Sequence, residues 1–366
     1  MSASTAERRG GARRAVALFF LAPLVGEYLL GNTPVTEPFA LLLFAPMYGG
    51  GAVLIHEAAR RTGRGWPTML VLAAAYALLE EGPVDMMLWN PVYGGFDIGD
   101  AYAGSYVPGL GTSLQLLQDS LTLHTVWSIC VPIALVEAWD ARSGPRPWLG
   151  GRGTVLVGAV FLLGVTGLCA MQIAGTGFVA SPAQFAWSGG VIVALVVLAF
   201  RLGRRPAVPR RERAPRPVVV AAAALAVTSV YWLRDLFLGE DAPWLLCGAW
   251  CAVVAGCVAL GARWARAADW GPAHRLALAG GALLTYVWSG PVTAVQSGTP
   301  VQVALAGGAA LGAGALWILY RGRRTAGAAA GTPGLGGDGA AAGAGSARTD
   351  PDRAVTADDR AHTADR

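Results

Sequence analysis

Ten apolar runs of membrane-spanning length divide this chain, and short polar loops separate them. A helix needs roughly 17–25 apolar residues to cross the hydrocarbon core of a bilayer. Only 14% of the residues are charged, against about 25% in a soluble domain, so most of the chain cannot cover a water-exposed surface. We therefore predict an all-α, polytopic transmembrane helix bundle of about ten spans, at about 15–31, 38–58, 67–90, 112–139, 152–174, 184–202, 217–238, 243–264, 273–296 and 301–320.

Arginine supplies all 28 basic residues, and its distribution among the loops predicts the orientation. It is abundant before the first run, after the last run, and in loops 59–66, 140–152, 201–217 and 262–275. It is absent from the alternate loops 32–37, 91–111, 175–183, 239–242 and 297–300. Because loops rich in basic residues stay inside the cell, we expect both termini to be cytoplasmic. The lack of lysine and the 50 glycines indicate a high-GC bacterial genome, so the predicted location is the bacterial cytoplasmic membrane.

The apolar runs and the arginine distribution together predict three segments. Residues 1–14 form a basic cytoplasmic N-terminus, residues 15–324 a ten-helix membrane domain, and residues 325–366 a cytoplasmic tail. The tail has almost no apolar side chains to bury, so we expect it to be disordered. The membrane domain divides into a polar first half, 15–139, and an apolar second half, 152–320. The arginines are explained by orientation, so we predict no nucleic-acid partner.

Ionisable side chains occur at membrane depth in the first half, and the second half has few of them. They are Glu27, Glu80, Glu81, Asp85, Asp119 and His124. A charge at the bilayer centre costs at least about 2.5–3.5 kcal/mol on insertion scales, so these groups should face the bundle interior. In the predicted orientation they occupy the central and outer membrane. We expect one polar cavity, open to the outside, with Glu27 and Asp119 near its mouth.

Gly82 and Pro83 directly follow the two glutamates. Proline lacks an N–H and clashes with the carbonyl four residues earlier, here that of Leu79, so we expect the helix to kink or break. A broken helix beside ionisable groups is typical of transporter binding sites. The alternative is a plain proline kink whose backbone groups are satisfied by neighbouring helices.

Two further polar pairs receive structural interpretations. His56 and Glu57 lie beside Arg60 near the end of a predicted span, which indicates a charged cap at the membrane interface. Arg234 and Asp235 are predicted to compensate each other near the outer surface. The outer loop 91–111 is rich in tyrosine and is expected either to lie along the interface or to cap the bundle.

One motif carries a family resemblance: Glu80-Glu81-Gly82-Pro83-Val84-Asp85, followed by His124 on the next span. It distantly resembles the CPBP (CAAX-type) intramembrane proteases, which pair an E-E-x-x-x-R helix with later membrane histidines around a metal or metal-like water-activating centre. Here Asp85 replaces the arginine, and Ser120 stands four residues before His124, where the family has Phe. The resemblance implies that Glu80 or Glu81 is a general base and that His124 holds a metal or polarises the substrate. The chain as a whole is more similar to uncharacterised multi-pass membrane proteins of actinobacteria, which imply no activity.

Three functions fit these features. The preferred hypothesis is a transporter or permease whose acidic and histidine groups bind a small cation or a proton-coupled solute. The second is an intramembrane metal-dependent hydrolase. The third is a non-catalytic scaffold in which the polar groups only hold helices together. The expected partners are the lipid bilayer and, under the first hypothesis, a small molecule or ion. The sequence assigns no cofactor.

Overall fold

The computed structural model describes residues 5–139, 144–202, 212–238 and 242–330, and the described part is a bundle of α-helices. The first half comprises α1 (Thr5–Pro23), η1 (Leu24–Leu29), α2 (Ala40–Arg61), α3 (Trp66–Leu79), η2 (Glu80–Val84), α5 (Leu114–Leu123), η4 (His124–Cys130) and α6 (Val131–Trp139). The second half comprises α7 (Gly151–Thr176), α8 (Pro182–Arg201), α9 (Pro217–Leu238), α10 (Pro243–Trp264), α11 (Pro272–Gln296) and α12 (Val301–Ala330). The predicted fold class, an all-α polytopic bundle, is confirmed.

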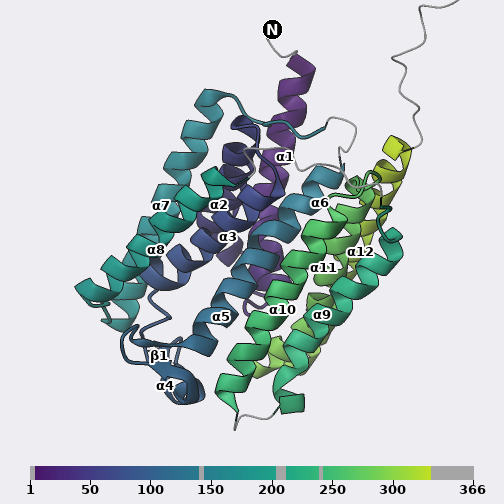
Figure 1. Ribbon diagram of the computed structural model, residues 1–366. Helices are drawn as coiled ribbons and strands as arrows, with labels where there is room; N and C mark the ends of the chain where they lie inside the picture. The colour runs from purple at the N-terminus through teal and green to yellow at the C-terminus, as the bar shows by residue number, and fades with distance from the viewer. Residues whose placement is uncertain (1–4, 140–143, 203–211, 239–241, 331–366) are drawn as a thin grey trace, which may run out of the picture. The chain divides into compact units, whose positions relative to one another are not determined.

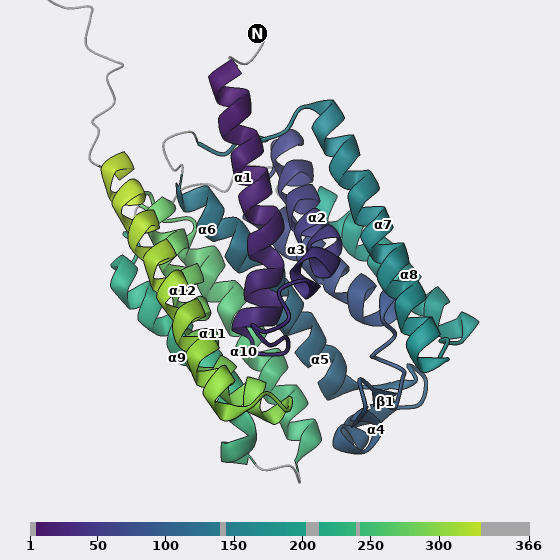
Figure 2. The same ribbon diagram turned by 180° about the vertical axis from the view of Figure 1, so that it is seen from behind.

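Among the described residues, eight helices are long and apolar enough to cross a membrane, with Leu114–Trp139 counted as one. The two other predicted spans, 15–31 and 67–90, are also largely helical, but each is divided between an α-helix and a short π-helical segment. The first consists of the end of α1, which begins among the arginines before residue 15, and of η1 with Glu27. The second consists of α3 and the short η2 with its two glutamates. Figures 1 and 2 place the start of α1 and the end of α12 at one end of the bundle, and β1 and α4 at the opposite end. The count of ten spans and the cytoplasmic termini remain predictions.

The helices of the second half cover those of the first. α7 packs against α2, and α8 packs against α3 (Figure 1). On the other side α11 packs against α6 and is itself flanked by α9 and α12 (Figure 2). α1, α2, α3 and the continuous α5–η4–α6 helix therefore lie between two outer groups of helices.

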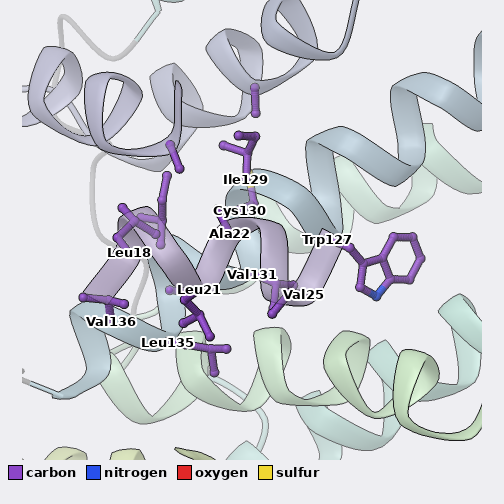
Figure 3. Packing of buried hydrophobic residues seen from close by; sticks show 14 of the residues in the cluster. Leu18, Leu21, Ala22, Val25, Trp127, Ile129, Cys130, Val131, Leu135 and Val136 are labelled. Atoms are coloured by element: carbon purple, nitrogen blue, oxygen red, sulfur yellow. The ribbon is translucent and has the colours of Figure 1, made fainter. Parts of the chain in front are cut away.

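The apolar core is centred on α1 and on the η4–α6 segment, where Leu18, Leu21 and Val25 pack near Leu135 and Val136 (Figure 3). Trp127, which is also buried, stacks on Tyr286 of α11 at 4.6 Å between ring centroids. Its indole N–H donates to the Ala282 carbonyl at 2.8 Å, so the bulky side chain keeps its polar atom satisfied. This pair fixes η4 against α11.

Glycine allows the closest helix contacts. A Cβ on Gly49 of α2 would overlap the backbone carbonyl of Phe19 on α1. A Cβ on Gly290 of α11 would likewise overlap the carbonyl of Leu29 on η1. Backbones that approach this closely tolerate only a residue without a side chain, as is common in membrane helix packing.

The structure differs from the predicted segment boundaries at both ends of the membrane domain. α1 begins at Thr5, so most of the basic 1–14 segment is helical and continues into the first predicted span. α12 extends to Ala330, and the Thr325 hydroxyl donates to the Ala138 carbonyl at 2.8 Å. The first six residues of the predicted tail are therefore part of the bundle, because a helix does not stop where hydropathy falls. Residues 331–366 of that tail lie outside the described residues.

The loop predicted at 91–111 forms small elements. β1 (Val92–Tyr93) pairs with β2 (Phe96–Asp97), and β3 (Tyr106–Val107) pairs with β4 (Thr112–Ser113), both antiparallel. α4 (Ile98–Ala101) and η3 (Ala103–Ser105) lie between the two hairpins. Two tyrosines of this loop bond to acidic side chains of the helices, as described below, so the loop packs onto the bundle.

Candidate functional site

Three π-helical segments carry most of the polar side chains predicted to be functional. Glu27 lies in η1, Glu80 and Glu81 in η2, and His124 in η4. π turns are rare and occur frequently at functional sites, because the extra residue in the turn redirects a side chain. All three segments lie among the inner helices of the bundle.

Each π segment lies at or near a proline. Pro23 precedes η1, Pro83 lies within η2, and Pro132 follows η4 by two residues. Proline cannot donate to the carbonyl four residues earlier, so a regular α-helix cannot pass through it unchanged. At the predicted break beside Gly82 and Pro83, α3 ends at Leu79 and the chain continues as η2.

His124 lies between two carboxylates. Its Nε2 is 2.5 Å from Oε1 of Glu81, and its Nδ1 is 2.9 Å from Oε2 of Glu80. Only 8% of the surface of His124 is exposed, with 2% for Glu80 and 5% for Glu81. The Ser128 hydroxyl, one turn further along η4, is 3.2 Å from the same Nδ1. Nε2 of His124 is therefore hydrogen-bonded to Glu81 and Nδ1 to Ser128, while Glu80 lies at ion-pair distance from Nδ1.

Part of each carboxylate remains without a hydrogen bond. Oε2 of Glu80 is within ion-pair distance of His124 but out of line for a hydrogen bond. Within the described structure it has no hydrogen-bonding partner, and neither does Oε2 of Glu81. Burying an oxygen acceptor without a partner costs about 1–3 kcal/mol, so such atoms are usually reserved for a proton, water or ligand.

Glu27 and Tyr48 extend this arrangement into η1 and α2. The Tyr48 hydroxyl donates to Oε1 of Glu27, and its ring centroid lies 5.9 Å from that of His124. Thr33 donates to the other Glu27 oxygen at 3.4 Å. We call Glu27, Tyr48, Glu80, Glu81 and His124 the central site. Four of the six predicted acidic and histidine residues therefore lie together.

The other two predicted residues, Asp85 and Asp119, bond elsewhere. Asp119 is paired with Arg234 of α9 at 2.6 Å and also accepts hydrogen bonds from Tyr231 and Tyr102. The sequence interpretation that paired Arg234 with Asp235 therefore missed its contact with Asp119, which lies far away in sequence. The side chain of Asp235 lies outside the described residues.

Asp85 faces the loop 91–111. It accepts a hydrogen bond from the Tyr93 hydroxyl at 3.0 Å and another from the Met87 backbone N–H at 3.1 Å. Burial, with the neighbouring Asp85, raises the pKa of Tyr93 well above its ordinary value, so the phenol keeps the proton that it donates. Glu81 and Asp85 are four residues apart and would share a face of a regular α-helix, but in the structure Glu81 contacts His124 and Asp85 contacts Tyr93.

The geometry is unsuited to metal binding. No group of three His, Cys, Asp or Glu side chains in the described residues has the arrangement of a metal site. The two carboxylates approach different nitrogens of His124, on different sides of the ring. A tetrahedral metal needs its ligands to converge on one point at about 2.0–2.2 Å, which these atoms do not do.

The residues of the central site line neither of the two cavities described in the structure. One is a groove of about 320 Å³ between η2 and α7, lined by apolar residues such as Leu79, Pro83 and Val165. The other, of about 180 Å³, lies near Arg213 and Trp264. The central site itself is closely packed, with Glu27 also only 9% exposed. An outward-open cavity at the site remains a prediction.

A family model described as an uncharacterized membrane protein family matches residues 16–320. The chain belongs to this family. The match covers nearly the whole predicted membrane domain, so the protein is a membrane protein residing in a lipid bilayer. No curated protein and no solved structure matches the chain. The family match assigns no chemistry, and it supports neither the resemblance to CPBP proteases nor an actinobacterial source.

Two tyrosines, Tyr48 of the central site and Tyr76 beside it, were not predicted from the sequence. Tyr48 and Tyr76 are both buried, and their rings lie 6.3 Å apart. A tyrosine within an apolar run does not stand out in a hydropathy pattern, and it is interpreted as an ordinary packing residue. A usable signal was present for Tyr76, since it lies four residues before Glu80 and thus on the same helix face.

Proposed function

We propose that this protein is a proton-coupled transporter or permease, with the central site as its proton-binding group. The observation that carries the proposal is the buried Glu80–His124–Glu81 arrangement, with a carboxylate at each ring nitrogen. Ionisable groups buried in a membrane bundle are expensive and usually mark ion pathways or proton relays. Three π turns favour function over simple helix cohesion, and so does Oε2 of Glu81, which has no hydrogen bond within the described residues.

The chemistry of the site suits proton exchange. Imidazole and carboxylate groups both bind and release protons, and here they lie within hydrogen-bond or ion-pair distance of one another. Tyr48 connects His124 with Glu27, which lies at the far end of the first helix from the basic N-terminus. A solute that binds at one protonation state and leaves at the other would be coupled to the proton gradient.

Reconstitution into liposomes with a trapped pH-sensitive dye tests this proposal. A potassium diffusion potential drives protons, and panels of monovalent cations, amino acids and organic amines supply candidate solutes. We expect the wild type to move protons with at least one solute class, and Glu81→Gln to lose this activity because shape is kept and charge is lost. Glu212→Gln is the matched control, since Glu212 is exposed and pairs with Arg263 far from the site. Wild-type vesicles that behave like empty ones with every solute class would reject the proposal.

A melting curve separates transport from the scaffold hypothesis. If the polar groups only hold helices together, Glu81→Gln removes one member of the buried Glu81–His124 pair and should lower the melting temperature, with no function to lose. If the site is functional, the same variant melts close to the wild type but is inactive in liposomes. Measuring the melting temperature and the transport activity of Glu81→Gln on one preparation therefore decides between the two hypotheses.

A second candidate, an intramembrane hydrolase, is favoured by one specific contact. Oε1 of Glu81 lies 2.5 Å from Nε2 of His124, within the reach expected of a general base and the group that orients it. This pair also carries the resemblance to CPBP proteases. Purified protein should then hydrolyse apolar peptide or ester reporters, with and without added Zn²⁺, and both Glu81→Gln and His124→Gln should abolish the activity. Hydrolysis that survives in both variants would exclude this candidate.

A further inference from the structure

The groove between η2 and α7 lies on the outer surface of the bundle. Figures 1 and 2 show α7 at one edge of the helices, and only 6% of its central residues are buried. Thr166 and Ala170, which line the groove, are both exposed. Because the protein resides in a lipid bilayer and this surface is apolar, lipid chains surround it. A molecule dissolved in the bilayer can therefore enter the groove from the side.

One face of α7 forms a long wall of the groove. Val165, Cys169 and Ile173 are spaced four residues apart, so they lie in a row that spans roughly 12 Å along the helix axis. Just before this row α7 is held close to α2, because a Cβ on Gly164 would lie only 2.7 Å from the Pro46 side chain. The wall is therefore fixed at one end, and its shape suits an extended alkyl chain.

The backbone carbonyl of Pro83 is a polar group on the opposite wall. In a regular α-helix it would accept the N–H of Met87, but that N–H donates to the Asp85 side chain at 3.1 Å. The next N–H, that of Leu88, donates to an earlier carbonyl of η2. The Pro83 carbonyl instead contacts the thiol of Cys169 at 3.8 Å, and a thiol is a weak donor. A carbonyl that faces an apolar groove in a membrane is available to a stronger donor.

The other polar groups at the groove are also acceptors. The Thr166 hydroxyl already donates to the Leu162 carbonyl at 2.8 Å, so it offers its oxygen. Asp85 directly follows Val84, which lines the groove, and it interacts electrostatically with Cys169. These groups match a ligand that donates hydrogen bonds.

The charges around the groove favour a cation. η2 packs against α3, α7 and α8, and the sequence has no arginine or lysine in residues 66–139 and 153–200. The acidic groups are the two carboxyls of η2 and Asp85, and the basic side chain beside them in the described structure is His124. Complementary charge selects partners, so a positively charged ligand fits this surface better than an anion.

We propose that the groove between η2 and α7 binds a single-chain amphiphilic cation with N–H donors, an alkylguanidinium or alkylammonium ion, which enters from the bilayer. Its chain lies along Val165 and Ile173, and its N–H groups bond to the Pro83 carbonyl close to Asp85. Ligand sites are commonly apolar hollows with a few polar groups that orient the ligand. The binding site stands by itself, whereas a role for this cation as the transported solute rests on the proposed transport function.

Photolabelling of the full-length protein in liposomes tests the binding. The probe is decylguanidinium with a diazirine on its chain, and mass spectrometry locates the label. We expect the label in residues 165–173 and in η2, and excess decylguanidinium should remove it. Butylguanidinium lacks the chain, decanol lacks the charge, and decyltrimethylammonium lacks the N–H donors. Each should compete at least about tenfold less well, since a hydrogen bond to a charged group contributes about 1.5–3 kcal/mol.

Two variants test the place and the charge of the site. Ala170→Phe fills the groove and should abolish the labelling that decylguanidinium removes. Ala159→Phe is the matched control, because Ala159 is exposed on the same helix and does not line the groove. Asp85→Asn keeps an acceptor for Tyr93 but loses the charge, so it should weaken competition by decylguanidinium about tenfold and leave that by decanol unchanged. Melting curves of all three variants check that the fold is kept.

Three results would overturn the binding proposal. Label spread over exposed positions of α7 such as Leu163, with the same yield in Ala170→Phe, would show ordinary contact with lipid. Equal competition by decanol and decylguanidinium would show that any lipid chain fills the groove. Competition by decylguanidinium that Asp85→Asn leaves unchanged would remove the basis for selecting a cation.

The solute role is tested separately, with decylguanidinium in the proton-flux assay. It keeps its charge and does not cross the bilayer as a free base, so it leaves the pH gradient intact. Wild type and Ala159→Phe should exchange protons for it, and Ala170→Phe should not. Flux that is the same in Ala170→Phe would overturn the solute role alone. If the wild type moves protons with no solute at all, the transport function is rejected, and photolabelling still decides whether the groove binds the cation.

Discussion

The two halves of the membrane domain are similarly apolar but occupy different places. In the spans Ala40–Arg61 and Leu114–Trp139 of the first half, 61% and 67% of the central residues are buried. In α7 and α8 of the second half the shares are 6% and 11%. Within a membrane, apolar side chains are equally suited to lipid and to the interior, so hydropathy does not separate the two positions. The few ionisable residues do, because lipid cannot solvate them.

α11 is the exception in the second half, with 56% of its central residues buried. It has no acidic residue at membrane depth, but it carries Thr285, Tyr286 and Ser289 in buried positions. Thr285 exchanges a hydrogen bond with Thr228 of α9 at 2.6 Å. Small and hydroxylated side chains therefore also mark an interior helix, by the close packing and hydrogen bonds that they permit.

The largest effect that we expect comes from removing the counter-ion of the central site. His124→Leu would leave Glu80 and Glu81 adjacent and buried without their partner. Removing one member of a buried charge pair costs about 3–5 kcal/mol. The melting temperature in detergent should fall strongly, and adding Glu80→Gln with Glu81→Gln to the same variant should restore much of it.

Arg263→Leu is the matched variant in the second half. It breaks the Arg263–Glu212 pair, whose side chains are 60% and 52% exposed. Water replaces the lost partner there, so the cost should be only about 0–1 kcal/mol. If His124→Leu and Arg263→Leu lowered the melting temperature equally, the proposed contrast between buried charge pairs in the first half and exposed ones in the second half would be incorrect.

A smaller effect is expected at the close helix contact between α1 and α2. Gly49→Ala forces a methyl group against the Phe19 carbonyl and should cost about 1–3 kcal/mol or more. Gly158→Ala on α7 is the control, because nothing lies within 4 Å of its added Cβ. Alanine is the better helix former by up to about 1 kcal/mol, so this variant should melt at the same or a slightly higher temperature. Equal losses in both variants would mean that α7 is as tightly packed as α2.

The fold followed from the sequence because its main determinants are local. Runs of apolar residues give helices of fixed length, and prolines at the starts of α3, α8, α10 and α11 mark where four of them begin. The convergence of Glu27, Glu80, Glu81 and His124 was also accessible, because depth along each span limited where these groups could meet. Asp85 and Asp119 were misplaced, since their partners Tyr93 and Arg234 come from elements whose positions depend on tertiary packing.

The local geometry of the site could not be read from the sequence. The π turns depend on how neighbouring helices accommodate Pro23 and Pro132 as well as Pro83, and a proline alone does not specify a π turn. The burial of His56 depends on Trp148, which lies beyond the end of α6 and returns to cover it. In each case the decisive contact joins residues that are distant in sequence.

The smallest expected effect concerns an exposed carboxylate of the second half, Asp269, between α10 and α11. It accepts the Ala214 N–H at 2.7 Å, and this hydrogen bond lowers the pKa of Asp269 below its ordinary value. A carboxyl whose pKa is lowered by folding stabilises the protein above its unfolded pKa of about 4, and this contribution disappears as pH falls through the lower folded value. Asp269→Asn should therefore melt slightly below the wild type at neutral pH, and the difference should close in acid. Because Asp269 is fully solvent-exposed, the difference should be far smaller than that of His124→Leu. If the difference in melting temperature between Asp269→Asn and the wild type stayed constant from neutral to acidic pH, the charge of Asp269 would not contribute to stability. The contrast between the two halves would then be sharper, because this exposed carboxylate of the second half would have no electrostatic effect.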